Sequence, residues 1–295
     1  MAQYQLSPID DSNEQFSSID MNMFQPDKLI QYLANKKELT ITAETDNLEY
    51  ILTNLPTNIK TITYLINDNT AKYLNIFGNL FKNIKVYKIK LFINSAGVNN
   101  WENVFNIIDS ISINNYIKKI ELNYNVSDIL NTLIRRLLAH NNNLISIKIL
   151  NNISINQETA QCISHYLIHN KTLKKIKFLS YVFGRDKFIY IISALFINKT
   201  LEKIQFGKGN FNFDKFDSMI ISKMLDINKS LYLLNIPNLS YEVNQKLKNN
   251  KQLRESIIAD KLNKLVLFNL HLPISNIIKE EFAEFYKNIP INVYE

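Results

Sequence analysis

Apolar side chains recur along this chain at relative positions 1, 4 and 6 of short segments that are otherwise largely polar. The first apolar residues of the eight copies are Ile59, Val86, Ile117, Leu144, Leu173, Leu201, Leu231 and Leu262. The first and the last lie 203 residues apart over seven intervals, an average of 29. Alternation of this kind predicts half-buried β-strands, and a fixed period of this length indicates one small structural unit repeated along the chain.

Stretches with helical periodicity lie between these segments, at 71–83, 101–114, 128–141, 157–170, 186–198 and 213–228. In 128–141, for example, Ile129, Leu133 and Leu137 follow one another at i, i+4 and i+8 and form a stripe that we expect to face the sheet. Asparagines such as Asn198 close these stretches, and asparagine tolerates the left-handed conformation that often ends a helix. One strand and one helix per repeat predict a solenoid with a parallel sheet inside and helices outside.

Position 9 of four consecutive repeats is asparagine: Asn67, Asn94, Asn125 and Asn152. With L-x-x-L-x-L, a helix and then N-x-T/S-L, the chain resembles the ribonuclease-inhibitor-like class of leucine-rich repeats over residues 37–272. This resemblance implies an α/β leucine-rich-repeat solenoid, a horseshoe with the parallel sheet on its concave face and helices on its convex face. We expect residues 1–36 to form an N-terminal cap with a partly disordered start, and 273–295 a C-terminal capping helix.

A cluster of carboxylates lies near the C-terminus, at Glu280, Glu281 and Glu284. Together with the Asn-, Ile- and Lys-rich repeats, this cluster resembles the leucine-rich-repeat effectors secreted by the Legionella type IV system. The resemblance implies a virulence effector that is translocated from the bacterial cytoplasm into a host cell. The same carboxylates also fit the solvated face of a capping helix, and the two interpretations are compatible.

Composition narrows the class of protein. Hydrophobic residues make up 46% and charged residues 21%, which is typical of a globular chain. A single cysteine, Cys162, excludes an internal disulfide and favours a reducing compartment, so we expect a cytoplasmic protein. We also expect the chain to be monomeric when free. No apolar run is long enough to span a membrane, and we expect no membrane partner. The formal net charge of +7 favours acidic partners.

Few residues suggest chemistry. Cys162 precedes His165 and His169 on one predicted helix, which invites a Cys–His pair or a metal site. The simpler interpretation is that Cys162 packs on the inner helix face and both histidines are exposed, because Tyr166 stands where a zincin would carry its catalytic glutamate. The GKG run at 207–209 lacks the rest of a phosphate loop, and Trp101 reads as a packing residue. We therefore expect no enzyme activity, no metal and no cofactor.

Positions 3, 5 and 7 of each strand should face solvent on the concave side if positions 4 and 6 face the core. Positions 3 and 5 are rich in lysine, whereas position 7 is largely apolar. Apolar anchors beside charges are typical of a protein-binding surface. The predicted contacts to a partner with an acidic surface are Lys88, Lys90, Phe92, Lys119, Glu121, Lys148, Leu150, Lys175, Lys177, Leu179, Lys203 and Phe268.

These features favour a secreted effector that regulates or inhibits a partner protein through its concave face. The alternative is a substrate adaptor that recruits a target to a host ubiquitin ligase, which would need an additional docking element that residues 1–36 do not clearly provide. Nucleic-acid binding ranks lower because arginine is scarce and position 7 is mostly aliphatic. We expect no nucleic-acid partner.

Overall fold

The computed structural model describes residues 26–41, 48–66, 74–94, 98, 101–124, 127–150, 155–179, 184–207, 214–236 and 239–267. Residues 1–25 of the predicted N-terminal cap and the whole predicted C-terminal cap at 273–295 lie outside these ranges, as do Asn67, Asn125, Asn152 and Phe268. By its internal contacts the chain divides into two units, Met1–Lys251 and Gln252–Glu295. The repeats belong to the first unit, which is described below by itself.

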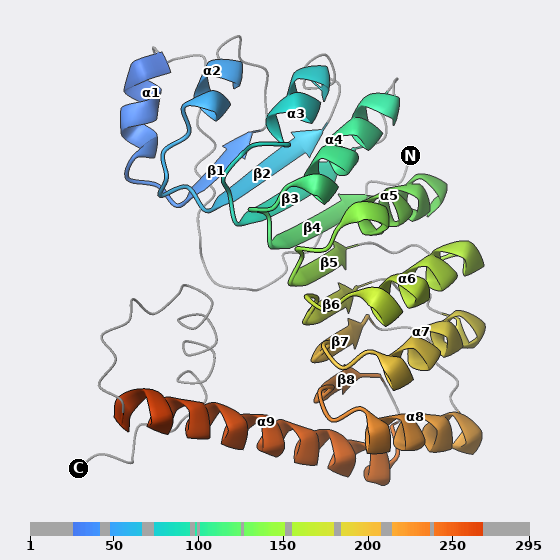
Figure 1. Ribbon diagram of the computed structural model, residues 1–295. Coiled ribbons are helices and arrows are strands. Elements are labelled where there is room, and N and C mark those ends of the chain that lie inside the picture. The colour runs from blue at the N-terminus through green and yellow to red at the C-terminus, as the bar shows by residue number, and fades with distance from the viewer. Residues whose placement is uncertain are drawn as a thin grey trace, which may run out of the picture. The chain divides into compact units, whose positions relative to one another are not determined.

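Eight strands form one parallel sheet in which each strand pairs with the next one along the chain (Figure 1). Their bounds are β1 Glu38–Ile41, β2 Thr61–Ile66, β3 Lys88–Ile93, β4 Lys119–Tyr124, β5 Ser146–Leu150, β6 Lys175–Phe178, β7 Lys203–Phe206 and β8 Leu233–Asn235. This order, with a helix after each strand, confirms the predicted leucine-rich-repeat type of α/β solenoid.

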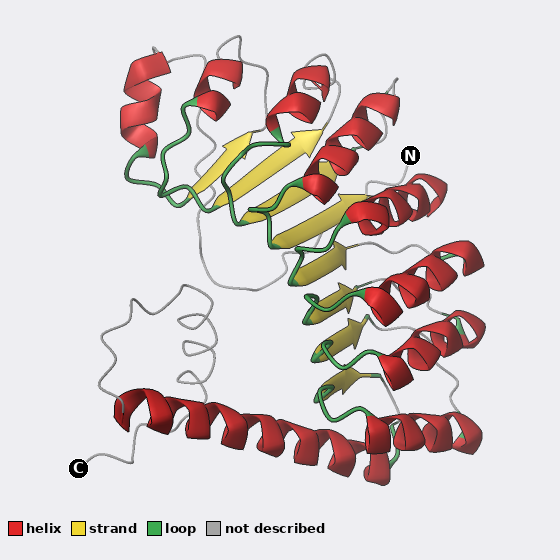
Figure 2. Cartoon of the chain, in the orientation of Figure 1, coloured by secondary structure: helices red, strands yellow, loops and turns green. Residues whose placement is uncertain are grey.

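The helices cover one face of the sheet and leave the other uncovered by helices of the repeats (Figure 2). Their bounds are α1 Pro26–Leu33, α2 Leu48–Thr53, α3 Leu74–Leu80, α4 Trp101–Ile113, α5 Ser127–His140, α6 Gln157–His169, α7 Arg185–Ile197, α8 Lys215–Ile227 and α9 Tyr241–Leu267. From α3 to α8, each helix falls within or almost within its predicted stretch. None of the described helices is long and apolar enough to cross a membrane.

The core lies between the sheet and these helices. Positions 4 and 6 of the strands are buried throughout, as in β3, where Ile89 and Leu91 have no exposed surface. On α5, Leu133 and Leu137 are buried as predicted, while Ile129 is partly buried. Because each repeat lies against its neighbours, the apolar residues form one continuous cluster along the unit.

The two ends of the repeat array differ from the prediction. The copy expected to begin at Leu262 is not a strand, because α9 is helical through Leu267. Its leucines at 262 and 265 are spaced i and i+3, which suits a helix equally well. The sheet instead gains β1, a copy that the apolar pattern missed because Lys36 occupies its first position.

The asparagines that end the helices are not in the left-handed conformation we expected. Asn170 has φ −76° and ψ 132°, and Asn198 has φ −65° and ψ 125°, both extended. Their side chains are buried. Most of them donate to carbonyl groups of the preceding repeat, whereas the Asn170 side chain bonds to groups of its own repeat. We call this set, together with Asn250 from within α9, the asparagine ladder, and its members are Asn114, Asn141, Asn170, Asn198, Asn228 and Asn250.

Asn198 shows how the ladder works. Its Nδ2 donates to the carbonyl oxygens of Leu167 (2.7 Å) and Asn170 (3.1 Å) in the preceding repeat. Its Oδ1 accepts from the backbone N–H groups of Thr200 (3.0 Å) and Leu201 (2.7 Å) at the entry to β7. Each such side chain satisfies backbone groups that would otherwise be buried without partners.

Candidate functional site

The face of the sheet opposite the helices, which we call the open face, carries the outward-pointing side chains of the strands. Row A comprises Glu38, Thr61, Lys88, Lys119, Ser146, Lys175, Lys203 and Leu233. Row B comprises Thr40, Thr63, Lys90, Glu121, Lys148, Lys177, Gln205 and Asn235. The strand register pairs these residues with one another, so the columns predicted from the sequence are true rows across the sheet.

Row C lies along the margin of the open face where the strands end, beyond row B, and is mostly apolar. Leu65, Phe92, Asn123 and Leu150 follow one another in register. Leu179 comes directly after β6 and is 38% exposed, while Phe92 and Leu150 are partly exposed. The structure thus brings eleven of the twelve predicted contacts onto one face, and only Phe268 lies outside the described residues.

Glu121 lies at the centre of the basic part of the open face. Its carboxylate accepts from the Lys148 ammonium at 3.0 Å and pairs with that of Lys88 at 3.2 Å. Burial would raise the pKa of this carboxyl, but the hydrogen bonds and charges of the two lysines more than offset burial and lower the pKa below its usual value. Since Glu121 is only 7% exposed, its role on this face is to position two lysines rather than to offer a large contact.

A second acidic residue, Glu38, was missed by the sequence analysis because β1 was not recognised as a repeat. Its Oε1 lies 2.7 Å from the Lys90 Nζ and accepts a 2.6 Å hydrogen bond from the hydroxyl of Thr63. Two other lysines lie over aromatic rings: Lys119 over Tyr87 at 4.8 Å, and Lys203 over Tyr232 at 5.4 Å. Such contacts restrict the lysine side chains while leaving their charge intact.

The open face is strongly basic even after these pairs are counted. Rows A and B hold seven lysines and two glutamates, which leaves a net charge of +5. A concentration of charge on one face raises the local potential and attracts partners of opposite sign. Positive rows bordered by the apolar row C are suited to hold an acidic surface that also presents apolar groups.

The described side chains considered for chemistry lie on α4 and α6, whereas 208–209 of the GKG run lie outside the described residues. His165 and His169 are exposed, as expected, and Cys162 is half-buried rather than fully packed inside. Burial raises the pKa of the Cys162 thiol, which disfavours the thiolate. Trp101 packs edge-on against Tyr124 with ring centroids 5.3 Å apart, as expected of a packing residue. Among the described residues, no group of three or more His, Cys, Asp and Glu could hold a metal ion.

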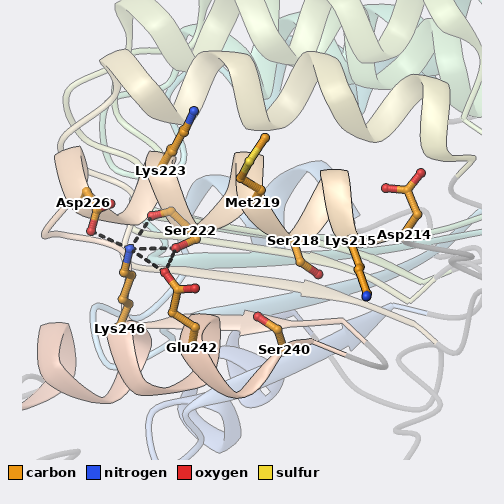
Figure 3. Close-up of a pocket in the computed structure, with 10 residues that line it drawn as sticks. All are labelled: Asp214, Lys215, Ser218, Met219, Ser222, Lys223, Asp226, Ser240, Glu242 and Lys246. Atoms are coloured by element: carbon orange, nitrogen blue, oxygen red, sulfur yellow. Dashed lines mark hydrogen bonds and ion pairs between the residues drawn. The ribbon is translucent and has the colours of Figure 1, made fainter.

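A polar cleft of about 520 Å³ lies between α8 and the start of α9 (Figure 3). Lys246 projects from α9 into a group of polar side chains, 2.7 Å from Asp226, 3.1 Å from Glu242 and 2.6 Å from the Ser222 hydroxyl. Hydrogen bonding to Asp226 raises the pKa of Lys246, and bonding to Lys246 lowers that of Asp226. Lys246 of α9 thus pairs with Asp226 of α8 as well as with Glu242 of its own helix, so the cluster fastens the start of α9 to α8 and retains one negative charge.

Comparisons with known proteins add little to this description. No protein-family model matches the chain, and no curated protein matches it. Among solved structures, the chain is similar to actin-binding site 2 of leiomodin-1, with 15% identity, a TM-score of 0.37, and coverage of 67% of this chain and 96% of that one. It is also similar to the C-terminal domain of tropomodulin from Caenorhabditis elegans, with 14% identity, a TM-score of 0.44, and coverage of 56% and 99%. At these scores neither likeness supports an argument, so the fold rests on the strand order and register.

Proposed function

We propose that this chain is a binding module, not an enzyme, and that it holds a partner protein with an acidic surface against the open face. The observation that carries this proposal is the juxtaposition of two lysine-rich rows with a partly exposed apolar row on one sheet. Exposed charges steer the encounter and select the partner, while apolar side chains buried on binding slow its dissociation.

The proposal assigns different kinetic roles to the two kinds of residue. Lys175→Glu and Lys177→Glu should mainly slow association and weaken its dependence on salt, because exposed charges act over long distances. Phe92→Asp and Leu179→Asp should raise the dissociation rate and cost on the order of 2 kcal/mol or more if either is an anchor. All four side chains point away from the core, so folding should change little.

The experiment is surface-plasmon kinetics at low and high salt, using a partner isolated by pull-down with the full chain. Lys215→Glu is the matched control, because it makes the same charge change at the start of α8, on the helical side of the sheet. Circular dichroism checks the folding of each variant. If all four open-face variants bind like the parent chain, the open face is not the interface.

We also propose, on the sequence resemblance to Legionella effectors, that the module acts as a secreted effector which regulates or inhibits its partner. Residues 273–295, with their glutamate cluster, would carry the translocation signal. A reporter fused to the full chain and to a chain without these residues should enter host cells only in the first case. Equal entry of both fusions would contradict the assignment of the signal.

A further inference from the structure

The loops that lead from each helix into the next strand lie along one edge of the sheet, because the strands are parallel and all begin at that edge (Figure 2). We call this the loop edge. It comprises residues 34–37, 54–60, 81–87, 114–118, 141–145, 170–174, 198–202 and 228–232. It is distinct from the open face, whose residues lie within the strands that follow or, for Leu179, directly after one.

The charged residues of the loop edge are almost all basic. Its ten lysines are Lys36, Lys37, Lys60, Lys82, Lys85, Lys118, Lys171, Lys174, Lys199 and Lys229. Glu202 is its one acidic residue and lies 3.4 Å from Lys174, so the eight loops carry a net charge of +9. At the spacing of neighbouring strands, the edge extends over roughly 34 Å.

Large apolar side chains protrude at this same edge. Ile113, Ile197 and Ile227 are the last residues of α4, α7 and α8, and they are 52%, 58% and 55% exposed. Each directly precedes a buried member of the asparagine ladder, so the three isoleucines occupy one position of the repeat. Tyr116, also 52% exposed, lies in the loop after α4 with the Lys85 ammonium 5.7 Å from its ring centroid.

Helix dipoles explain part of this pattern. A cation near the C-terminus of a helix is favourable, and Lys199 donates to the carbonyl oxygens of Phe196 (2.9 Å) and Ile227 (3.1 Å). The dipole does not explain why isoleucines end three helices at positions open to water. Scattered exposed apolar residues are ordinary, but these recur at one structural position and lie among lysines.

We propose that the loop edge docks the protein on a membrane surface that contains anionic lipids. Basic residues near such a surface are attracted to the headgroups, and protruding aliphatic and aromatic side chains enter the boundary between headgroups and acyl chains. A nucleic acid fits less well, since isoleucine neither stacks on bases nor bonds to them and these loops contain no arginine. The absence of a membrane-spanning run, which led us to expect no membrane partner, does not bear on surface binding.

The proposal leaves the open face available to a protein while the loop edge contacts lipid, because the two surfaces use different residues. Open-face variants such as Lys177→Glu should therefore retain much more vesicle binding than loop-edge variants. Failure of one proposal leaves the other standing.

The test is co-sedimentation of the full chain with phosphatidylcholine vesicles with and without phosphatidylserine. The parent chain should bind the anionic vesicles and not the neutral ones. Ile197→Ser/Ile227→Ser and Lys82→Glu/Lys171→Glu should each weaken binding at least about tenfold. Only the lysine variant should also show a weaker salt dependence, because its two charge reversals lower the net charge of the loop edge from +9 to +5.

The controls place one isoleucine change and two lysine changes away from the loop edge. Ile189→Ser alters an isoleucine of α7 that is 41% exposed, and Lys215→Glu/Lys223→Glu alters two exposed lysines of α8. These controls should bind like the parent chain. The proposal is overturned if the parent chain ignores anionic vesicles, if the isoleucine variant binds them unchanged, or if the controls lose binding equally. Tighter binding of a single-stranded oligonucleotide, insensitive to the isoleucines, would overturn it in favour of nucleic acid.

Discussion

Replacing Asn198 by alanine tests directly what joins one repeat to the next. The side chain is 3% exposed and bonds two carbonyl groups of the preceding repeat and two N–H groups at the entry to β7. Its own carbonyl oxygen accepts from the Asn228 side chain at 2.8 Å. Asn198→Ala therefore removes the side-chain bonds in the middle of the ladder while leaving the backbone-mediated bond to Asn228 in place.

The magnitude follows from these four backbone groups. An intramolecular hydrogen bond makes a net contribution of about 1 kcal/mol to the free energy of unfolding, and a buried polar group left without a partner costs about 1–3 kcal/mol. Water entering the space vacated by the amide would satisfy some of the four groups. We therefore expect Asn198→Ala to lower the free energy of unfolding by about 2–4 kcal/mol.

Urea unfolding followed by far-UV circular dichroism measures this change. The control is Asn142→Ala, an exposed asparagine in the loop before β5, whose replacement should change the unfolding free energy by less than about 0.5 kcal/mol. Because repeat arrays can unfold in stages, the midpoint and the slope should both be compared. If Asn198→Ala unfolds like the control, the ladder does not contribute to stability and the reasoning is wrong.

Three further predictions concern single residues. The pKa of Glu121 is lowered in the folded state, so the ionised carboxylate stabilises the fold above its unfolded pKa near 4.5, and this stabilisation is lost as pH falls. Glu121→Gln should therefore lower the free energy of unfolding at neutral pH and flatten the acid limb of a plot of that free energy against pH. Cys162 should react slowly with a thiol reagent in the native state, and Cys162→Ala should bind as the parent does; rapid labelling with lost binding would contradict this. Within the described part of the chain the buried Tyr124 hydroxyl has no hydrogen-bond partner, so Tyr124→Phe should raise the unfolding free energy by about 1 kcal/mol, and a destabilised variant would point to an unseen partner.

The strand and helix pattern was predictable because burial imposes it on the sequence. Position 4 of the eight strands is Leu or Ile in every copy, from Leu39 to Leu234, so a period of 29 residues stands out from a single chain. The two errors arose where burial does not decide. The first error was to overlook β1, because the first position of that copy lies at the end of the array and is Lys36 instead of an apolar residue. The second error was to predict a strand from Leu262, where the spacing of the leucines fits a strand and a helix equally well.

The site was predictable only in part, because sequence gives the side of a strand but not the neighbours across the sheet. The columns of lysines followed from alternation alone. The pairing of Glu121 with Lys88 and Lys148 depends on the register of three strands, and that register has no local signal in the sequence. The asparagines at the helix ends were recognised in the sequence, but we assigned them to left-handed helix ends. Asparagine suits that role and a buried hydrogen-bonding role equally well, so the sequence alone does not distinguish the two.

Composition alone does not account for the charge of the open face. Lysine is abundant in this chain, with 30 of 295 residues, yet it fills seven of the sixteen positions in rows A and B. Restricting lysine to exposed positions raises its expected share about twofold, and its low preference for β-strands lowers that share again. The remaining excess lies on one face of one sheet, beside the apolar row C, where packing within the repeats makes no demand for positive charge. A requirement from outside the chain, such as an acidic partner, explains it more directly than composition does.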